Sequence, residues 1–234
     1  MGPVRYGGGL FTPAVFYLLV ANVVLFAIRL FAPTFAIGWL ALIPNQFLFR
    51  VQLWRVVSYL FIHGDFAHLF FNMIALFFFG PALERSLGYN RFFKFYFLCG
   101  VGAGIFSVLF YKLLGQGGAI IIGASGAIFG VLAGYALFFP NSTVYLNFIL
   151  PIKAKWMVLI FALMELFATV QYAGGGRSGI ASIAHISGMA IAYFYLRGRG
   201  DFRKLSFRYK YWRAERERKK HFKVYKSQDQ DRYH

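Results

Sequence analysis

The sequence contains little charge over most of its length. Charged residues make up 14% of the 234 residues and hydrophobic residues 59%, whereas a soluble domain has about 25% charged and about 45–50% apolar residues. The net charge of +17 comes mainly from the C-terminus, because more than half of the 25 Lys and Arg residues follow Leu196. This composition excludes an ordinary soluble domain and indicates an integral membrane protein.

Cysteine and clustered metal ligands are also lacking. The single cysteine, Cys99, excludes an intramolecular disulfide and a cysteine-based metal cluster. His63, His68 and His185 lie in or beside apolar segments, which raises the question of zinc. The chain offers them neither a His-x-x-x-His pair nor three nearby carboxylates. We therefore predict no metal site and no cofactor.

Long apolar runs predict six membrane-spanning helices. A helix needs about 17–25 mostly apolar residues to cross the hydrocarbon core. Six segments are candidates: 13–31, 66–83, 92–111, 125–139, 156–173 and 180–196. We expect an all-α, polytopic membrane domain over residues 1–196, followed by a basic tail over residues 197–234.

The fourth run is short, and the sequence before it is rich in glycine. Fifteen residues of helix rise about 22 Å, less than the hydrocarbon core of about 30 Å. The preceding stretch, residues 115–123, would enter the membrane as irregular chain, which is tolerated only inside protein or beside water. We expect the fourth helix to begin at membrane depth, with Ser125 at its positively polarised N-terminus.

Residues 32–65 are too polar to span the membrane and too aromatic for a solvated linker. They contain Trp39 and Trp54, and Trp side chains concentrate at membrane interfaces. We expect this segment, the first loop, to lie in the interface.

The basic tail predicts the orientation. Under the positive-inside rule both termini lie in the cytoplasm, and the start of the fourth helix faces the opposite side. The tail is either a topology signal alone or also a segment that binds anionic lipid. No motif supports binding of nucleic acid.

Small residues recur every four positions on the fourth and sixth runs. Such stripes let two membrane helices approach closely. The members are Gly126, Gly130 and Gly134 on one run and Ala184, Gly188 and Ala192 on the other. Packing of the two stripes would bring Ser125 into contact with His185.

Ser125 and His185 are the residue types of a nucleophile and its base. A serine hydroxyl is a weak nucleophile unless a base within hydrogen-bond reach takes its proton. Polar side chains at hydrocarbon depth are costly and rarely idle. No acidic residue lies near His185 in the sequence, which favours a Ser–His dyad over a triad. Taken alone, either residue has an alternative role as an ordinary hydrogen-bonding group between helices.

His68 and Asn72 are candidates for stabilising an oxyanion. They are four residues apart on the second run and share one helix face. Together with the backbone N–H of Ser125, they offer three donors to a carbonyl oxygen that becomes negatively charged. The alternative is that they only bond neighbouring helices together.

Five short motifs occur in order along the chain. They are WR at 54–55, HGDFAHLFFN at 63–72, GPALERSLG at 80–88, GASG at 123–126 and AHISG at 184–188. With these motifs the chain resembles the rhomboid intramembrane serine proteases over about residues 40–196. The resemblance implies a six-helix bundle that hydrolyses a peptide bond of single-span membrane proteins near the extracytoplasmic face, in a bacterial cytoplasmic membrane.

The resemblance also implies roles for individual residues. Ser125 is the nucleophile, His185 the base, and His68, Asn72 and the Ser125 amide form the oxyanion hole. Supporting positions are Gly123, Gly126, Phe129, Gly188 and His63. The alternative for His63 is that it only lines a water path above the site. Two positions depart from the family pattern: Phe129 stands where many relatives have a Tyr stacked on the histidine, and Ala192 where many have Gly.

Glu165 has no assigned partner in the sequence. An acid in the middle of a span is a functional candidate by default, but a structural bond to a neighbouring helix is favoured. Two other functions remain as alternatives. One is a non-catalytic rhomboid-like protein that binds membrane clients, which loss of Ser125 or His185 would favour. The other is a proton-coupled transporter, which lacks the expected paired broken helices.

Overall fold

The computed structural model describes residues 12–146, 149–173 and 181–198. The chain divides into two units, residues 1–195 and 196–234. The basic tail from residue 199 onward lies outside the described residues, so its predicted roles stay predictions.

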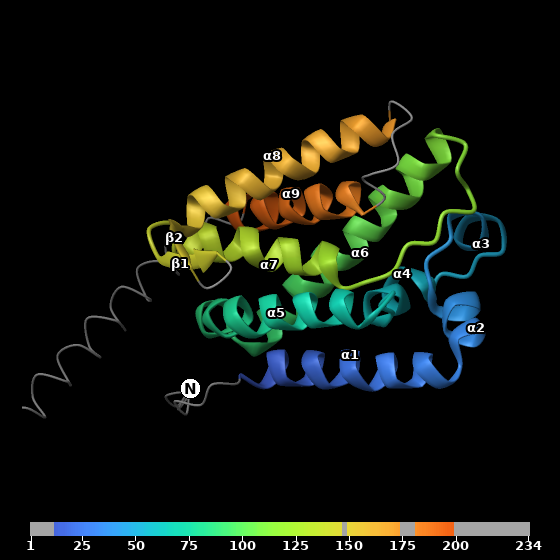
Figure 1. Cartoon of the computed structure of the whole chain (residues 1–234), viewed down its shortest axis with the longest axis horizontal. Coiled ribbons are helices and arrows are strands. Elements are labelled where there is room, and N and C mark those ends of the chain that lie inside the picture. Colours follow the sequence, from blue (N-terminus) through green and yellow to red (C-terminus); the bar gives the residue numbers. More distant parts are fainter. Residues whose placement is uncertain (1–11, 147–148, 174–180, 199–234) are drawn as a thin grey trace, which may run out of the picture. The chain divides into compact units, whose positions relative to one another are not determined.

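Six helices occupy the positions of the six apolar runs (Figure 1). They are α1 (Pro13–Phe31), α5 (Phe66–Leu87), α6 (Tyr89–Leu113), α7 (Ser125–Phe138), α8 (Ala154–Ala173) and α9 (Ser182–Gly198). Four of them, α1, α5, α6 and α8, are long and apolar enough to cross a membrane. The protein is therefore a helical membrane protein, while the count of six spans stays a prediction.

The short helix α7 lies in the middle of the helical layer. It contacts α5 and α6 most extensively and packs on α8 as well, while α1 packs against α5. Almost all residues of α7 are buried, from Ser125 to Phe138. On α8, in contrast, large apolar side chains such as Leu163 and Phe167 are exposed, as expected for a helix that faces lipid.

The chain before α7 is irregular, as the glycine-rich sequence predicts. It is held by backbone hydrogen bonds to the first loop: Leu42 and Ile121 exchange a pair, and the Gly123 N–H donates to the Tyr59 carbonyl. These bonds satisfy part of the backbone of a segment that forms no helix of its own. As a result, α7 begins at Ser125, well inside the helical layer.

The first loop folds into short helical segments rather than extended chain. These segments are α2 (Pro33–Phe35), η1 (Ala36–Leu40), α3 (Pro44–Phe49), α4 (Arg55–Ser58) and η2 (Tyr59–Phe61). The buried guanidinium of Arg55 donates to the carbonyls of Gly38 and Ala41 and braces the loop. The rings of Trp39 and Trp54 stack and remain half exposed.

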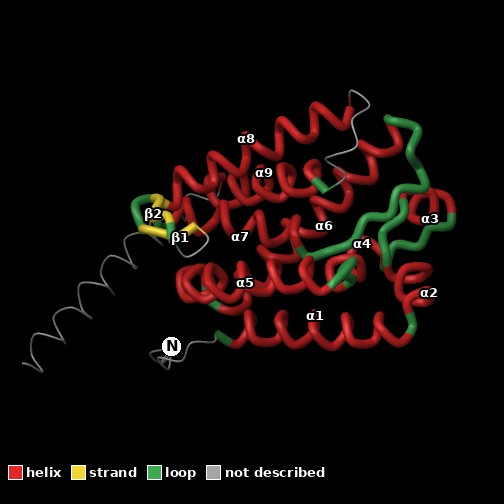
Figure 2. Tube along the Cα trace, in the orientation of Figure 1, coloured by secondary structure: helices red, strands yellow, loops and turns green. Residues whose placement is uncertain are grey.

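The all-α prediction needs one correction. A two-stranded antiparallel hairpin, β1 (Thr143–Leu146) and β2 (Leu150–Lys153), joins α7 to α8 (Figure 2). Thr143, Val144 and Tyr145 are β-branched or aromatic, which favours a strand. The strands are too short for their pattern to stand out beside long apolar runs.

Glu84 fixes the start of α1 on α5. Its carboxylate accepts hydrogen bonds from the Thr12 hydroxyl and from the backbone N–H groups of Ala14 and Val15. These amides belong to the first turn of α1, where helix N–H groups lack partners and an anion is favoured. A buried carboxylate thus becomes a clamp between two helices.

Candidate active site

The structure brings Ser125 and His185 into direct contact. Ser125 is the first residue of α7, and His185 lies one turn into α9. The Ser125 Oγ and the His185 Nε2 are 2.7 Å apart, which is hydrogen-bond distance. The hydroxyl therefore has a base within reach although the two residues are 60 positions apart in the sequence.

The contact depends on a close crossing of α7 and α9. A Cβ atom added to Gly188 would overlap the carbonyl oxygen of Gly126 and come within 2.9 Å of its carbonyl carbon. One added to Gly126 would lie 3.3 Å from the Ala184 carbonyl oxygen. Only glycine permits this approach of the two backbones. The small-residue stripes thus meet at the end that carries Ser125 and His185.

Phe129 holds the face of the histidine ring. It lies one turn after Ser125 on α7, and its ring stacks on the His185 ring with centroids 4.2 Å apart and an interplanar angle of 7°. The ring of Phe129 has no polar group, so its contribution is packing. This stacking restricts rotation of the imidazole while its Nε2 faces Ser125.

His68 and Asn72 both approach the turn before Ser125. A Cβ atom added to Gly123 would lie 2.6 Å from His68 Nε2 and 3.8 Å from Asn72 Nδ2. The φ angle of Gly123 is +110°, a backbone conformation that residues other than glycine rarely adopt. Gly123 therefore provides both the backbone conformation and the space in which the two polar groups reach the turn.

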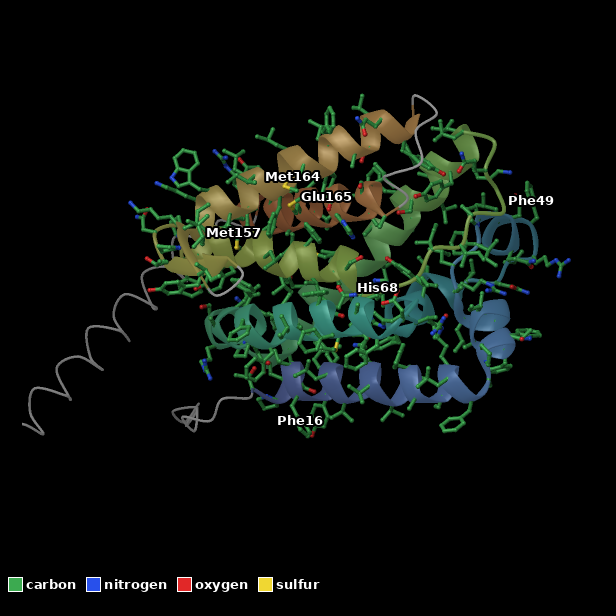
Figure 3. All side chains as sticks on the ribbon, viewed as in Figure 1. Phe16, Phe49, His68, Met157, Met164 and Glu165 are labelled. Carbon is green, nitrogen blue, oxygen red and sulfur yellow. The ribbon has the colours of Figure 1, made fainter. Side chains whose placement is uncertain are left out.

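Hydrogen bonding indicates which nitrogen of His68 carries the proton. The Gly64 N–H donates to His68 Nδ1 at 3.3 Å, so Nδ1 is an acceptor and the proton resides on Nε2. The Nε2–H group points toward Gly123 in the turn before α7, and Figure 3 shows His68 on the side of α5 that faces α7. Asn72 Nδ2 is buried and has no hydrogen-bond partner among the described residues. Both groups are N–H donors near the turn that precedes Ser125.

His63 contacts the turn that precedes Ser125. It is fully buried, and its Nε2 lies 3.5 Å from the Ala124 amide nitrogen. Burial, with a smaller contribution from neighbouring His68, lowers the pKa of His63 to about 4. The neutral ring accepts a hydrogen bond from the Ala124 N–H, next to Ser125. A residue that only lined a water path would not need this contact.

Glu165 lies beside the second nitrogen of His185. Its Oε1 is 2.9 Å from His185 Nδ1, and Figure 3 shows Glu165 on the side of α8 that faces α9. The Ser182 side chain, one turn before His185, lies near the same carboxylate. The sequence favours a purely structural role for this acid. The signal that points to it is the presence of an acid within an apolar span.

Comparison with known proteins identifies the family. Residues 50–200 match the family model of the Rhomboid domain. The chain belongs to the rhomboid family. This confirms the resemblance that the five sequence motifs carry.

Several named rhomboid proteins align with this rhomboid chain. RHOMBOID-like protein 4 of Arabidopsis thaliana is 36% identical over 141 residues, which cover 60% of this chain and 32% of the relative. Rhomboid protein 1, mitochondrial, of Saccharomyces cerevisiae is 35% identical over 109 residues, covering 45% and 31%. RHOMBOID-like protein 12, mitochondrial, of Arabidopsis thaliana is 27% identical over 154 residues, covering 60% and 45%. The chain thus spans less than half the length of each of these relatives.

Proposed function

We propose that this rhomboid is an intramembrane serine endopeptidase that cleaves single-span membrane proteins. The observation that carries the proposal is the 2.7 Å distance between Ser125 Oγ and His185 Nε2. Family membership supports it, because a rhomboid domain covers both residues. Position supports it as well, since a polar pair of this kind is costly inside a membrane protein unless it is used.

The reaction follows from the site geometry. His185 Nε2 takes the proton of Ser125 as Oγ attacks the peptide carbonyl, and the resulting imidazolium then gives the proton to the leaving amine. Negative charge on the carbonyl oxygen is stabilised by His68 Nε2–H, Asn72 Nδ2–H and the Ser125 amide. Water then hydrolyses the ester on Ser125 with His185 again as base, which regenerates the enzyme.

The substrate is a transmembrane helix that unwinds near the membrane surface. A peptide carbonyl inside a regular helix is hydrogen-bonded and shielded, so Ser125 reaches only a chain that has opened. Gly and Pro weaken a helix by about 1 and 3 kcal/mol relative to Ala, which favours cleavage beside such residues. With both termini in the cytoplasm, the cut falls toward the outer face of a bacterial cytoplasmic membrane. We also propose that the basic tail, residues 197–234, binds anionic lipid headgroups.

The test is cleavage of a panel of single-span proteins in liposomes. We expect wild-type protein to cut at least one of them and Ser125→Ala and His185→Ala to cut none, because each change removes one half of the nucleophile–base pair. Ser107→Ala is the matched control, since the one bond of the Ser107 hydroxyl among the described residues goes to the Ala103 carbonyl on its own helix. Binding of the panel without cleavage by wild type would instead support a non-catalytic client-binding protein.

A further inference from the structure

The second nitrogen of His185 needs an acceptor for its proton. When Nε2 takes the Ser125 proton, Nδ1 must already carry a hydrogen, and a buried N–H group without an acceptor is unfavourable. Among the described residues His185 Nδ1 has no partner that meets hydrogen-bond geometry. The acidic oxygen beside it is Glu165 Oε1, at 2.9 Å.

The contact has the distance of an ion pair, while its angle departs from a straight N–H···O line. Catalytic hydrogen bonds are often poorly aligned without substrate and tighten when it binds. Formation of this hydrogen bond requires a rotation of one of the two side chains. Phe129 already restricts the plane of the His185 ring, and the Ser182 side chain lies near the Glu165 carboxylate.

We propose that Glu165 is a positioning residue that completes a Ser125–His185–Glu165 arrangement. This inference rests on the proposed protease function. The carboxylate holds the proton on Nδ1, so that the lone pair of Nε2 faces Ser125, and it stabilises the imidazolium that forms during attack. Three helices therefore supply the site: α7 the nucleophile, α9 the base and α8 the acid.

A purely structural role is the competing explanation. Glu165 contacts both His185 and Ser182, so its carboxylate could serve only to hold α8 against α9. A structural tie affects stability and substrate entry, whereas a positioning residue affects the rate at which Ser125 becomes nucleophilic. The two roles separate in the kinetic constants.

The experiment compares Glu165→Gln and Glu165→Ala with wild type in liposomes. Glutamine keeps the shape and an acceptor oxygen but removes the charge. In a fully buried Ser–His–Asp triad the equivalent change costs roughly 10⁴ in kcat. Glu165 is 20% exposed, so we expect a loss of roughly 10²-fold in kcat with KM changed less than twofold, and a larger loss for alanine. The rate of labelling of Ser125 by a fluorophosphonate probe should fall by the same factor.

A spectroscopic readout isolates the effect on the histidine. The ¹⁵N signals of His185, assigned by their loss in His185→Ala, should indicate the Nδ1–H tautomer in wild type and a mixture in Glu165→Ala. Met164→Ala is the matched control on α8, because Met164 is 61% exposed next to Glu165. It should leave kcat, probe labelling and the tautomer unchanged.

The outcomes separate the two proposals. Absence of cleavage by wild type would overturn the protease function itself, and cleavage by Ser125→Ala at the wild-type rate would overturn Ser125 as its nucleophile. Loss of cleavage in Ser125→Ala together with wild-type kcat and labelling in Glu165→Gln would overturn only the positioning role. A variant that loses stability or raises KM while kcat and tautomer stay unchanged would also overturn it, in favour of the structural tie.

Discussion

Substitution of Gly188 by alanine should inactivate the protein with little loss of helix content. The added Cβ would overlap the Gly126 carbonyl oxygen and lie 2.9 Å from the carbonyl carbon, where ordinary contact begins at 3.4 Å. Both atoms belong to the backbone of α7, so no side chain can rotate to make room. The strain must be relieved by movement of α9 away from α7.

That movement acts directly on the Ser125–His185 pair. His185 lies one turn before Gly188 on the same helix, so its ring moves with the backbone. The 2.7 Å bond from His185 Nε2 to Ser125 Oγ then stretches out of hydrogen-bond range. A misplacement of about 1 Å costs roughly 10² in rate, while overpacking costs about 1–3 kcal/mol of stability.

The assay measures kcat in liposomes and fluorophosphonate labelling of Ser125, with circular dichroism as the check on folding. We expect Gly188→Ala to lose at least roughly 10² in kcat. Gly102→Ala is the matched control, because a Cβ atom added there would meet, within the described part of the chain, only the side chain of Ile191 on α9. That side chain can adopt another rotamer, so activity should stay close to wild type. Wild-type kcat in Gly188→Ala would refute the argument that the glycine crossing sets the distance between Ser125 and His185.

Three further predictions concern the clamp, the buried histidine and the oxyanion donors. Glu84→Ala should lower stability by about 3 kcal/mol, since it removes charge-assisted bonds to the start of α1; an unchanged thermal midpoint in detergent would argue against the clamp. Because the pKa of His63 is about 4 when folded and about 6.5 when unfolded, stability should fall by up to about 3 kcal/mol as pH drops from 6.5 to 4. Thermal unfolding of His63→Gln, compared with wild type across that range, should lack this dependence. Asn72→Ala should reduce kcat by roughly 10²-fold or less, and combination with His68→Ala should be non-additive because both donors serve one oxygen; additive losses would assign them separate roles.

The helices follow from the sequence because apolar runs of membrane length have few alternative structures. The predicted run 13–31 coincides with α1, and the predicted start at Ser125 is the start of α7. The second helix extends beyond the predicted residue 83 to Leu87. Apolarity ends at Glu84, but its charge is satisfied by the first turn of α1. The helix therefore continues to Leu87. Gly88 follows it, and its φ of +84° turns the chain into α6.

The hairpin between α7 and α8 and the contacts of His63 were not predictable in the same way. A four-residue strand has no pattern that separates it from a turn, and its formation depends on a partner across the loop. His63 belongs to the motif at residues 63–72, which indicates a functional role but does not predict which group the side chain contacts. Its partner is a backbone amide, Ala124 N–H. Because almost every residue has a backbone N–H, the sequence does not indicate which one His63 contacts.

Glu165 marks the limit of reasoning from sequence for a different reason. Ser125, His185 and Glu165 lie on three helices, and proximity among them is decided by how closely those helices cross. The glycine spacing predicts the crossing of α7 and α9, which yields the Ser–His contact. Nothing comparable marks the contact of α8 with α9, because α8 has no stripe of small residues that would orient it. An acid far along the chain from His185 can therefore lie against its ring while the sequence around the histidine contains none. What the sequence does show is that burying a carboxylate in a membrane helix costs free energy. An intramembrane carboxylate without an assigned partner is therefore a candidate partner for any histidine on a neighbouring helix.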